Sequence, residues 1–250
     1  MKHTRRSAIA KSLALVGAAA VLRATAHAEA ATAPSGAGWP ALSANLARIC
    51  RCLAIETFGN IEWHSQIDMA LATGFDAAAR QALLEAIDFS ALTKDFDFGP
   101  KGRSSRPVDI GVGWERDGKI IKAKLVGIGA GHGIPPHVHK NMTTATLVLS
   151  GKVRIRQFNR LGDLDGGVLV RPVMDRMQTA GDWSSISSDR ANLHWFTAED
   201  EPVFLLNINV ENLGGKAIPG IRVEVDDAPL RSDTHMARYI SKEDAEARYG

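Results

Sequence analysis

Tyrosine and cysteine are both scarce in this chain, with two of each among 250 residues. The tyrosines, Tyr239 and Tyr249, lie near the carboxyl end, so no tyrosine is placed to assist a reaction in the middle of the chain. Cys50 and Cys52 lie two apart on a predicted helix, where side chains at that spacing do not face each other. We therefore expect no disulfide and interpret them as small semi-buried apolar residues, with a labile thiol pair as the alternative.

Acidic residues are absent from the first 28 positions, which hold five basic residues. Arg5 and Arg6 precede an apolar run over residues 12–22, and small residues follow, with cleavage sites near Ala28 and Ala30. A basic start, a short apolar run and small residues form the pattern of an export signal. We therefore expect a periplasmic mature protein.

The paired arginines favour one export route. The segment around Arg5 and Arg6 resembles a twin-arginine signal, whose pathway carries folded proteins. An ordinary secretory signal and a retained membrane anchor are the alternatives.

Neither sign of charge dominates the rest of the chain. Five of the 30 basic residues lie in the amino-terminal segment, which leaves 25 against 28 acidic residues, a net charge of about −3. This balance gives no electrostatic basis for nucleic-acid binding. No later apolar run approaches the ~20 residues that span a bilayer, so we expect no stable membrane span after signal removal.

Composition and periodicity divide the chain into five parts. Apolar residues recur at helical spacing after Ser43, which is the predicted N-cap of one helix, and Asp76 is the predicted N-cap of a second helix. The predicted parts are an export signal, a linker, a helical segment, a barrel and a tail ending in a short charged helix, at residues 1–30, 31–41, 42–100, 101–226 and 227–250.

Beyond residue 101 the pattern changes to short apolar runs separated by turn residues. Many short strands at close spacing, with no helical stretch between them, predict a β-sandwich or barrel. The candidate strands are residues 120–128, 145–149, 152–158, 168–173, 195–197, 203–210 and 221–225.

Three histidines carry the chemical signal. His137 and His139 lie two apart, so on a strand both imidazoles point to the same face and can meet one ion. His194, before the strand at 195–197, is the third candidate ligand. Three neutral ligands on one side of an ion leave the other side open, which suits Fe(II) oxygen chemistry and also catalytic zinc. Nickel and manganese are further alternatives.

The spacing around these histidines resembles the cupin superfamily. Gly131, His137, His139 and Gly151 match the first cupin motif, and Thr144 stands where most cupins have a glutamate. The resemblance implies a mainly β fold: a double-stranded β-helix or jelly-roll barrel, here preceded by a helical segment. Cupins often pair through edge strands, so a homodimer is the implied assembly.

Within the cupins, the metal motifs resemble the three-histidine thiol dioxygenases of the cysteamine dioxygenase and plant cysteine oxidase type. The segment from Ile134 to Thr144 is similar to their first motif, with Met142 and Thr143 matching, and Asn192, His194 and Ala198 match their second. The resemblance implies an Fe(II) enzyme that uses O₂ to oxidise a small thiol to a sulfinate. The alternatives are a non-catalytic metal- or ligand-binding cupin and a zinc cupin that activates water.

The candidate substrate pocket is less defined than the metal site. Arg154 and Arg156 alternate on one strand and can hold a carboxylate if they face inward, or else form an outward solvated pair that leaves Gln157 facing in. Trp195 and Phe196 flank the third histidine and are candidate pocket walls, with packing in the barrel core as the alternative. Thr144 completes the candidate set.

Overall fold

The computed structural model describes residues 38–250, so the predicted export signal and most of the predicted linker lie outside the described residues. The helices are α2 (Gly38–Ala54), α3 (Asn60–Gly74), α4 (Ala77–Ala86), α5 (Phe89–Thr93) and α6 (Lys242–Tyr249). Among residues 38–250, no helix is both long enough and apolar enough to cross a membrane.

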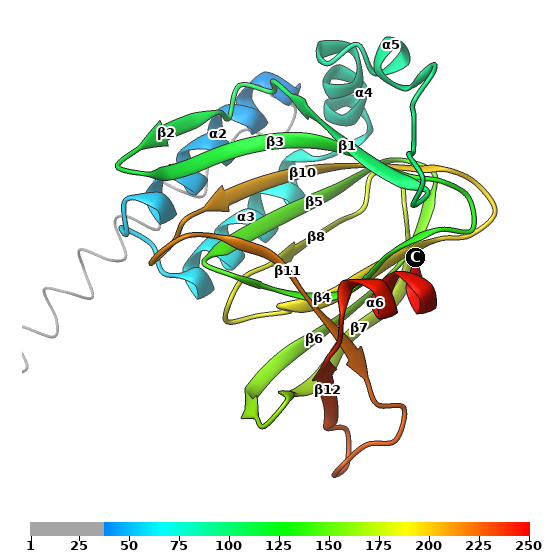
Figure 1. Ribbon diagram of the computed structural model, residues 1–250. Helices are drawn as coiled ribbons and strands as arrows, with labels where there is room; N and C mark the ends of the chain where they lie inside the picture. Colours follow the sequence, from blue (N-terminus) through cyan, green and yellow to red (C-terminus); the bar gives the residue numbers. More distant parts are fainter. Residues whose placement is uncertain (1–37) are drawn as a thin grey trace, which may run out of the picture.

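Twelve strands follow the first four helices (Figure 1). They are β1 (Arg103–Val108), β2 (Trp114–Arg116), β3 (Lys119–Ile128), β4 (Gly133–Lys140), β5 (Met142–Ser150), β6 (Lys152–Leu164), β7 (Gly167–Thr179), β8 (Trp183–Ile186), β9 (Leu193–Ala198), β10 (Val203–Glu211), β11 (Ile218–Val225) and β12 (His235–Tyr239). All seven predicted strand segments overlap one of these strands.

The first helix begins earlier than the sequence predicted. Helix α2 starts at Gly38, inside the predicted linker, with Pro40 in its first turn, where a missing N–H costs nothing. The prediction of Ser43 as N-cap is wrong, because Ser43 lies within the helix and its hydroxyl donates to the Pro40 carbonyl at 3.0 Å. The prediction for Asp76 is confirmed: its carboxylate accepts from the Ala79 N–H at 2.8 Å and caps α4.

The strands form two sheets. The first sheet has the order β1-β3-β10-β5-β8, with β2 paired to β3, and the second sheet has the order β11-β12-β7-β6-β9-β4. From β3 to β10 the chain passes back and forth between the orders β3-β10-β5-β8 and β4-β9-β6-β7, except that β6 and β7 are consecutive and pair in the same sheet. Two facing four-stranded sheets with this connection are the jelly roll. The prediction of a mainly β barrel preceded by helices is confirmed.

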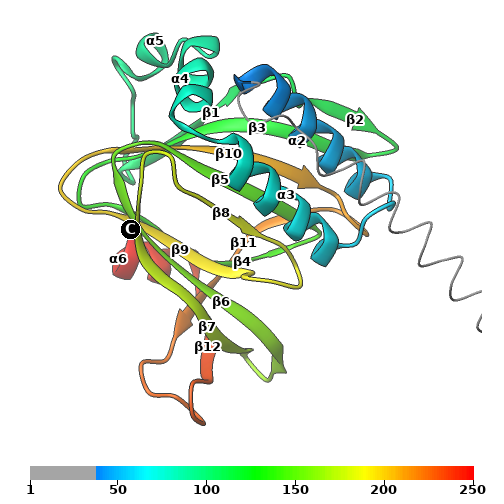
Figure 2. The ribbon, with the colours of Figure 1, turned by 180° about the vertical axis from the view of Figure 1, so that it is seen from behind.

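Helices cover the outer face of the first sheet. In Figure 2, α2 and α3 lie in front of β10, β5 and β8. Apolar residues alternate on these strands, and the outward set packs with the buried faces of α2, α3 and α4 into one core; from the sheet it includes Ile121, Leu125, Leu147, Leu206 and Ile208. The amphipathic helices therefore bury a face that a sandwich would otherwise expose.

The space between the two sheets is packed at one end. Val126, Val148, Ile155, Val203 and Leu205 form a core there with Phe196. Further along the same inward faces the side chains become polar, and the interior opens into a cavity. The alternation of each strand thus continues, but its inward residues change from aliphatic to hydrogen-bonding groups.

The second sheet also closes on itself. Strand β11 pairs with β4 and β12, and β12 pairs with β7, so six strands form a small closed barrel. Val138, Leu193 and Trp195 point into this barrel from β4 and β9. Residues 227–250 were predicted as a tail outside the barrel. That boundary is wrong, because β12 supplies Ala237 to this core and completes the closure.

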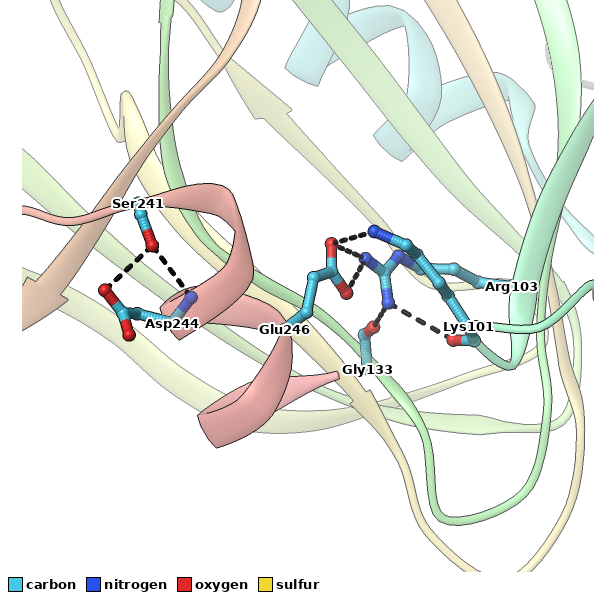
Figure 3. A network of polar contacts seen from close by, with 6 residues as sticks. All are labelled: Lys101, Arg103, Gly133, Ser241, Asp244 and Glu246. Carbon is cyan, nitrogen blue, oxygen red and sulfur yellow. Dashed lines mark hydrogen bonds and ion pairs between the residues drawn. The ribbon is translucent and has the colours of Figure 1, made fainter.

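Helix α6 lies beside β4 and β11 (Figure 1). Ser241 caps it by accepting from the Asp244 N–H at 3.0 Å. Figure 3 shows Glu246 of α6 bound by Arg103 and by Lys101, while Arg103 also donates to the Gly133 carbonyl at 2.9 Å. The carboxyl-terminal helix is therefore tied to the start of β1 and to the strand that carries two of the histidines.

A buried polar network joins α3 to β8. The two ring nitrogens of His64 lie 2.9 Å from the hydroxyls of Ser185 and Ser187, and Ser185 donates to Asp68 at 2.7 Å. Burial, followed by the positive charge of Arg190, lowers the pKa of His64 to about 4. His64 is therefore neutral in the folded protein near pH 7, and its hydrogen bonds join the helix to the sheet.

We expect His64 to make the fold sensitive to acid. The unfolded state takes up a proton on this histidine below its ordinary pKa of ~6.5, whereas the folded state does not until pH falls to about 4. Stability contributed by neutral His64 is therefore present above pH 6.5 and lost as pH falls. Between pH 7 and pH 5 the loss should be about 1–2 kcal/mol larger in the wild type than in His64→Gln. Urea unfolding at both pH values measures it, and equal losses would contradict this assignment.

Candidate metal centre

Three imidazoles converge on the inward faces of β4 and β9. His137 and His139 share one face of β4 because they lie two apart, and His137 is paired directly with His194 of β9. One ligand nitrogen from each of the three rings lies within 4.8 Å of the others, and all three side chains are buried. The structure thus brings together the three histidines that the sequence singled out.

Backbone carbonyls fix the direction of two of the rings. His137 Nδ1 lies 2.8 Å from the Pro135 carbonyl, and His194 Nδ1 lies 2.9 Å from the Asn192 carbonyl. An Nδ1–H that donates to a carbonyl leaves the lone pair on Nε2 free for an ion. These two rings are therefore held in the tautomer that a metal ligand needs.

The side chain of Asn192 binds the backbone of His139. The Asn192 side chain accepts from the His139 N–H at 2.7 Å and donates to the His139 carbonyl at 3.0 Å. This pair of hydrogen bonds extends the contact between the two strands beyond their last ladder pair, His137 with His194. The Nδ1 atom of His139 is buried without a hydrogen-bond partner among the described residues. A ring nitrogen without a hydrogen-bond partner is available as a donor atom for a metal ion.

Burial keeps the three rings neutral. Desolvation is the main cause that lowers the pKa of His137 and His139 well below the usual value, and it lowers the pKa of His194 to about 4. The nearby charges of Arg222 and Lys124 add to this effect, Arg222 at all three rings and Lys124 at His139. Neutral imidazole is the form that binds metal, so the donor set fits a divalent ion.

Among residues 38–250, no carboxylate takes part in the cluster. Thr144, at the position where most cupins have a glutamate, is buried, and its hydroxyl donates to Asn209 Oδ1 at 2.9 Å. The substitution is thus accommodated by a neutral hydrogen-bonded pair across β5 and β10. The three-nitrogen set suits zinc, iron, nickel or copper better than the hard ions magnesium and calcium, which prefer oxygen.

Two turns frame the histidine strand. Asn141 joins β4 to β5 with a φ of 59°, a left-handed conformation that asparagine tolerates better than most residues. Gly151 follows β5 with a φ of 81°, and a Cβ there would lie 2.5 Å from the Pro202 carbonyl oxygen. Glycine is therefore required at the end of β5, whereas asparagine suffices at the turn between β4 and β5.

A cavity of about 310 Å³ lies next to the cluster. Its walls come from strands of both sheets, and residues on both sides of the histidines are polar or cationic. The lining residues are Arg103, Ser104, Ser105, Lys124, Val126, Ile134, His137, His139, Met142, Thr144, Thr146, His194, Phe196, Asn207, Asn209 and Arg222. A volume of this size suits a small metabolite.

Two of the predicted pocket residues line this cavity and three do not. Thr144 and Phe196 are in its wall. Trp195 points the opposite way, into the small closed barrel, where its ring stacks on Phe158 at 5.3 Å between centroids. Arg154 and Arg156 face outward and pair with Asp175 at 2.7 and 3.2 Å. Of the two arrangements that the sequence left open for these three residues, the pocket is wrong, because alternation along β6 and β9 turns them away from it.

Several lining residues were missed from the sequence. Lys124 of β3, Asn207 of β10 and Thr146 of β5 lie side by side in one row across the first sheet. Asn209 and Thr144 lie together in the next row. The sequence did contain a sign of this polar wall, because polar residues lie two apart on β3, β5 and β10, which are otherwise apolar. Arg222, opposite His137 on β11, gave no comparable signal.

We expect the chain to bind one divalent metal ion through the three histidines. His139→Ala should abolish retention of the ion through dialysis against a mild chelator, whereas His132→Ala, at an exposed neighbouring position, should not.

Because burial lowers the pKa of His194 to about 4, protons should displace the ion only below about pH 5 rather than near the ordinary histidine pKa of ~6.5. Metal analysis across pH 4–8 tests this, and release centred near pH 6.5 would contradict it.

Comparison with known proteins gives similarity in fold alone. No family model matches the chain, and no curated protein matches it. Similar solved structures include procruciferin, an 11S globulin from Brassica napus, at 14% identity over 46% of this chain and 26% of that chain, with a TM-score of 0.34. The Cnp3 cupin domain of Schizosaccharomyces pombe is similar at 14% identity, over 44% of this chain and 64% of that chain, with a TM-score of 0.32. Oxalate oxidase is similar at 19% identity, over 51% of this chain and 60% of that chain, with a TM-score of 0.35.

These three similar structures leave the activity open. In each case the chain covers less than two thirds of the solved chain. One fold hosts many functions, so function has to be argued from the site. By the order of its strands, the chain has a jelly-roll fold, with helices before the barrel and a three-histidine cluster suited to a divalent metal inside it.

Proposed function

We propose that this protein is an Fe(II)-dependent dioxygenase that oxidises a small thiol to a sulfinate, with both oxygen atoms of O₂ passing to sulfur. The observation that carries the proposal is the neutral donor set. Three buried imidazoles face a small cavity, and Thr144 stands where a carboxylate ligand would otherwise contribute a negative charge.

The charge of the donor set favours an anionic sulfur ligand. Three neutral ligands leave the charge of a divalent ion uncompensated, so a thiolate gains more at such a site than at one that already holds a carboxylate. When bound, iron supplies open coordination positions and the electrons needed to activate O₂. The protein contributes the placement of its three nitrogens and the shape of the cavity.

The surrounding residues hold the site rigid and partly dry. The carbonyls of Pro135 and Asn192 orient two rings, and Phe196 packs edge-on against His194 at 5.6 Å between centroids. Phe196 is itself buried in the core between the sheets, so it closes the cavity on that side. The polar residues of the first sheet line another wall of the same cavity.

A zinc hydrolase is less well supported by this site. Activating water at zinc calls for a nearby general base, usually a carboxylate or histidine. The described part of the chain contributes no carboxylate to the lining of the cavity, and Glu199 and Asp200 lie exposed on the turn after β9. The remaining alternative, a metal-binding protein without turnover, predicts a bound ion but no reaction.

Oxygen uptake tests the proposed reaction. We expect protein reconstituted anaerobically with Fe(II) to consume O₂ when given one of a panel of small thiols, with one sulfinate formed per O₂. His139→Ala should lose this activity because it loses an iron ligand, and Arg154→Gln, on the outer face, should keep it.

Two results would contradict the thiol dioxygenase. Tight binding of iron without uptake for any thiol would leave another substrate or a sensing role. Preference for zinc, with no iron retained, would favour hydrolysis or a structural site.

We also propose that the protein is exported. The amino terminus carries Arg5 and Arg6 before a short apolar run, and a twin-arginine route would deliver the folded, metal-loaded protein. In a bacterial host, the full chain should reach the periplasm as a shortened form. Arg5→Lys with Arg6→Lys should hold it in the cytoplasm at full length, because that route requires the arginine pair. Fractionation and mass measurement test this, and unchanged export of the double variant would indicate an ordinary secretory signal.

A further inference from the structure

Two cations in the cavity have no anionic partner. Lys124 points into it from β3 and Arg222 from β11, and both are half-buried. Neither side chain makes a hydrogen bond or ion pair with any residue in the described part of the chain, and Arg222 Nη1 is buried without an acceptor. Uncompensated charge in a partly buried position is costly, so it calls for an explanation.

The carboxylates near these two cations form ion pairs with other basic residues. Glu211, which attracts Lys124, is bound by Lys122 at 2.8 Å. Glu246, which attracts Arg222, is bound by Arg103 and lies 3.4 Å from Lys101 (Figure 3). Each acid thus has a closer partner, and Arg103 is the only lining cation in residues 38–250 that is neutralised in this way. The cavity is positive even before a metal ion adds to it.

A neutral donor completes the arrangement. Asn209 lines the cavity and accepts from Thr144 through Oδ1, while its Nδ2 is buried with no acceptor among the described residues. Buried donors in folded proteins almost always have a partner, so unpartnered buried donors around one cavity indicate that a ligand supplies the acceptors. The buried donors are Arg222 Nη1 and Asn209 Nδ2, and the partly buried Lys124 Nζ lines the same cavity without an ion pair.

We propose that this cavity binds a small organic carboxylate, with its anionic group between Lys124 and Arg222 and its other end toward the three histidines. The inference rests on the proposed function only in naming a substrate: if the reaction is thiol oxidation, the substrate is a thiol that carries a carboxylate. An amine-bearing thiol would bring its ammonium group against two cations and is disfavoured.

The walls of the cavity favour carboxylate over phosphate. Phosphate sites commonly use backbone N–H groups at a helix start or a glycine-rich turn. All the residues that line this cavity lie on strands, and the available donors are side chains. A planar carboxylate, with two acceptor oxygens, matches a guanidinium and an ammonium that approach from different strands.

Binding of simple carboxylates tests the proposal directly. The probes are propionate, its neutral counterpart propionamide and inorganic phosphate, measured by calorimetry with metal-free and anaerobic Fe(II)-loaded full-length protein. We expect propionate to bind in both forms at least about tenfold more tightly than propionamide, since a hydrogen bond to a charged group is worth a factor of this order. Lys124→Gln and Arg222→Gln should each weaken propionate about tenfold or more, and Arg154→Gln should not.

Stability separates this role from a structural one. If Lys124 and Arg222 serve a ligand, replacing either with glutamine relieves an unpaired charge, so the ligand-free variants should be at least as stable as the wild type. Loss of propionate binding together with equal or higher thermal stability supports the proposal. Variants that lose stability in parallel with binding would show that the cations hold the fold, and would overturn it.

The outcomes also distinguish this inference from the proposed reaction. Propionate binding that depends on both cations, with no thiol ever consumed, would sustain the carboxylate site and end the thiol hypothesis. Oxygen uptake with 2-aminoethanethiol equal to that with 3-mercaptopropionate, and unaffected by Arg222→Gln, would end the carboxylate site and sustain the thiol reaction. Phosphate binding without propionate binding would also overturn the present inference.

Discussion

The burial of three neutral imidazoles against one another is the constraint on which the rest of the site depends. A buried histidine cannot carry a proton cheaply, and three of them within 4.8 Å would repel one another if charged. Backbone carbonyls accept from the Nδ1–H groups of His137 and His194. The side chain of Asn192 hydrogen-bonds the backbone of His139. The cluster is thereby prepared for a cation before one arrives, so little reorganisation opposes binding.

Both outer faces of the jelly roll are covered. Helices α2, α3 and α4 bury the outside of the first sheet, and the hairpin-like pair β11 and β12 buries the outside of the second. The histidine strands therefore have ligands on one face and an apolar core on the other, with Val138 and Trp195 in that core. This double packing fixes the register of β4 and β9, because a slip by one residue would exchange the two faces.

The sequence was sufficient for the parts of the molecule that obey local rules. Two histidines at strand spacing and alternating apolar residues predicted the strands and the shared face of His137 and His139, whereas the resemblance to the cupin motifs, not a local rule, added His194. It was insufficient where the outcome depends on which face of a strand turns inward. For Arg154 and Trp195 the sequence left the pocket and its alternative open, and only the structure shows that the pleat turns both away from the cavity.

The metal motif and the rest of the cavity bear on different properties of the ligand. The histidines lie on β4 and β9, within the segments that resemble the thiol dioxygenases, and they determine what metal chemistry the site can support. Lys124 and Arg222 come from β3 and β11, outside those segments, and they determine which charge the cavity accepts. Arg222 reaches the site only because β11 closes against β4, a pairing between residues about 80 positions apart that no local pattern encodes. Resemblance at the metal motif therefore bears on the reaction class, and the charge of the non-motif strands bears on the substrate.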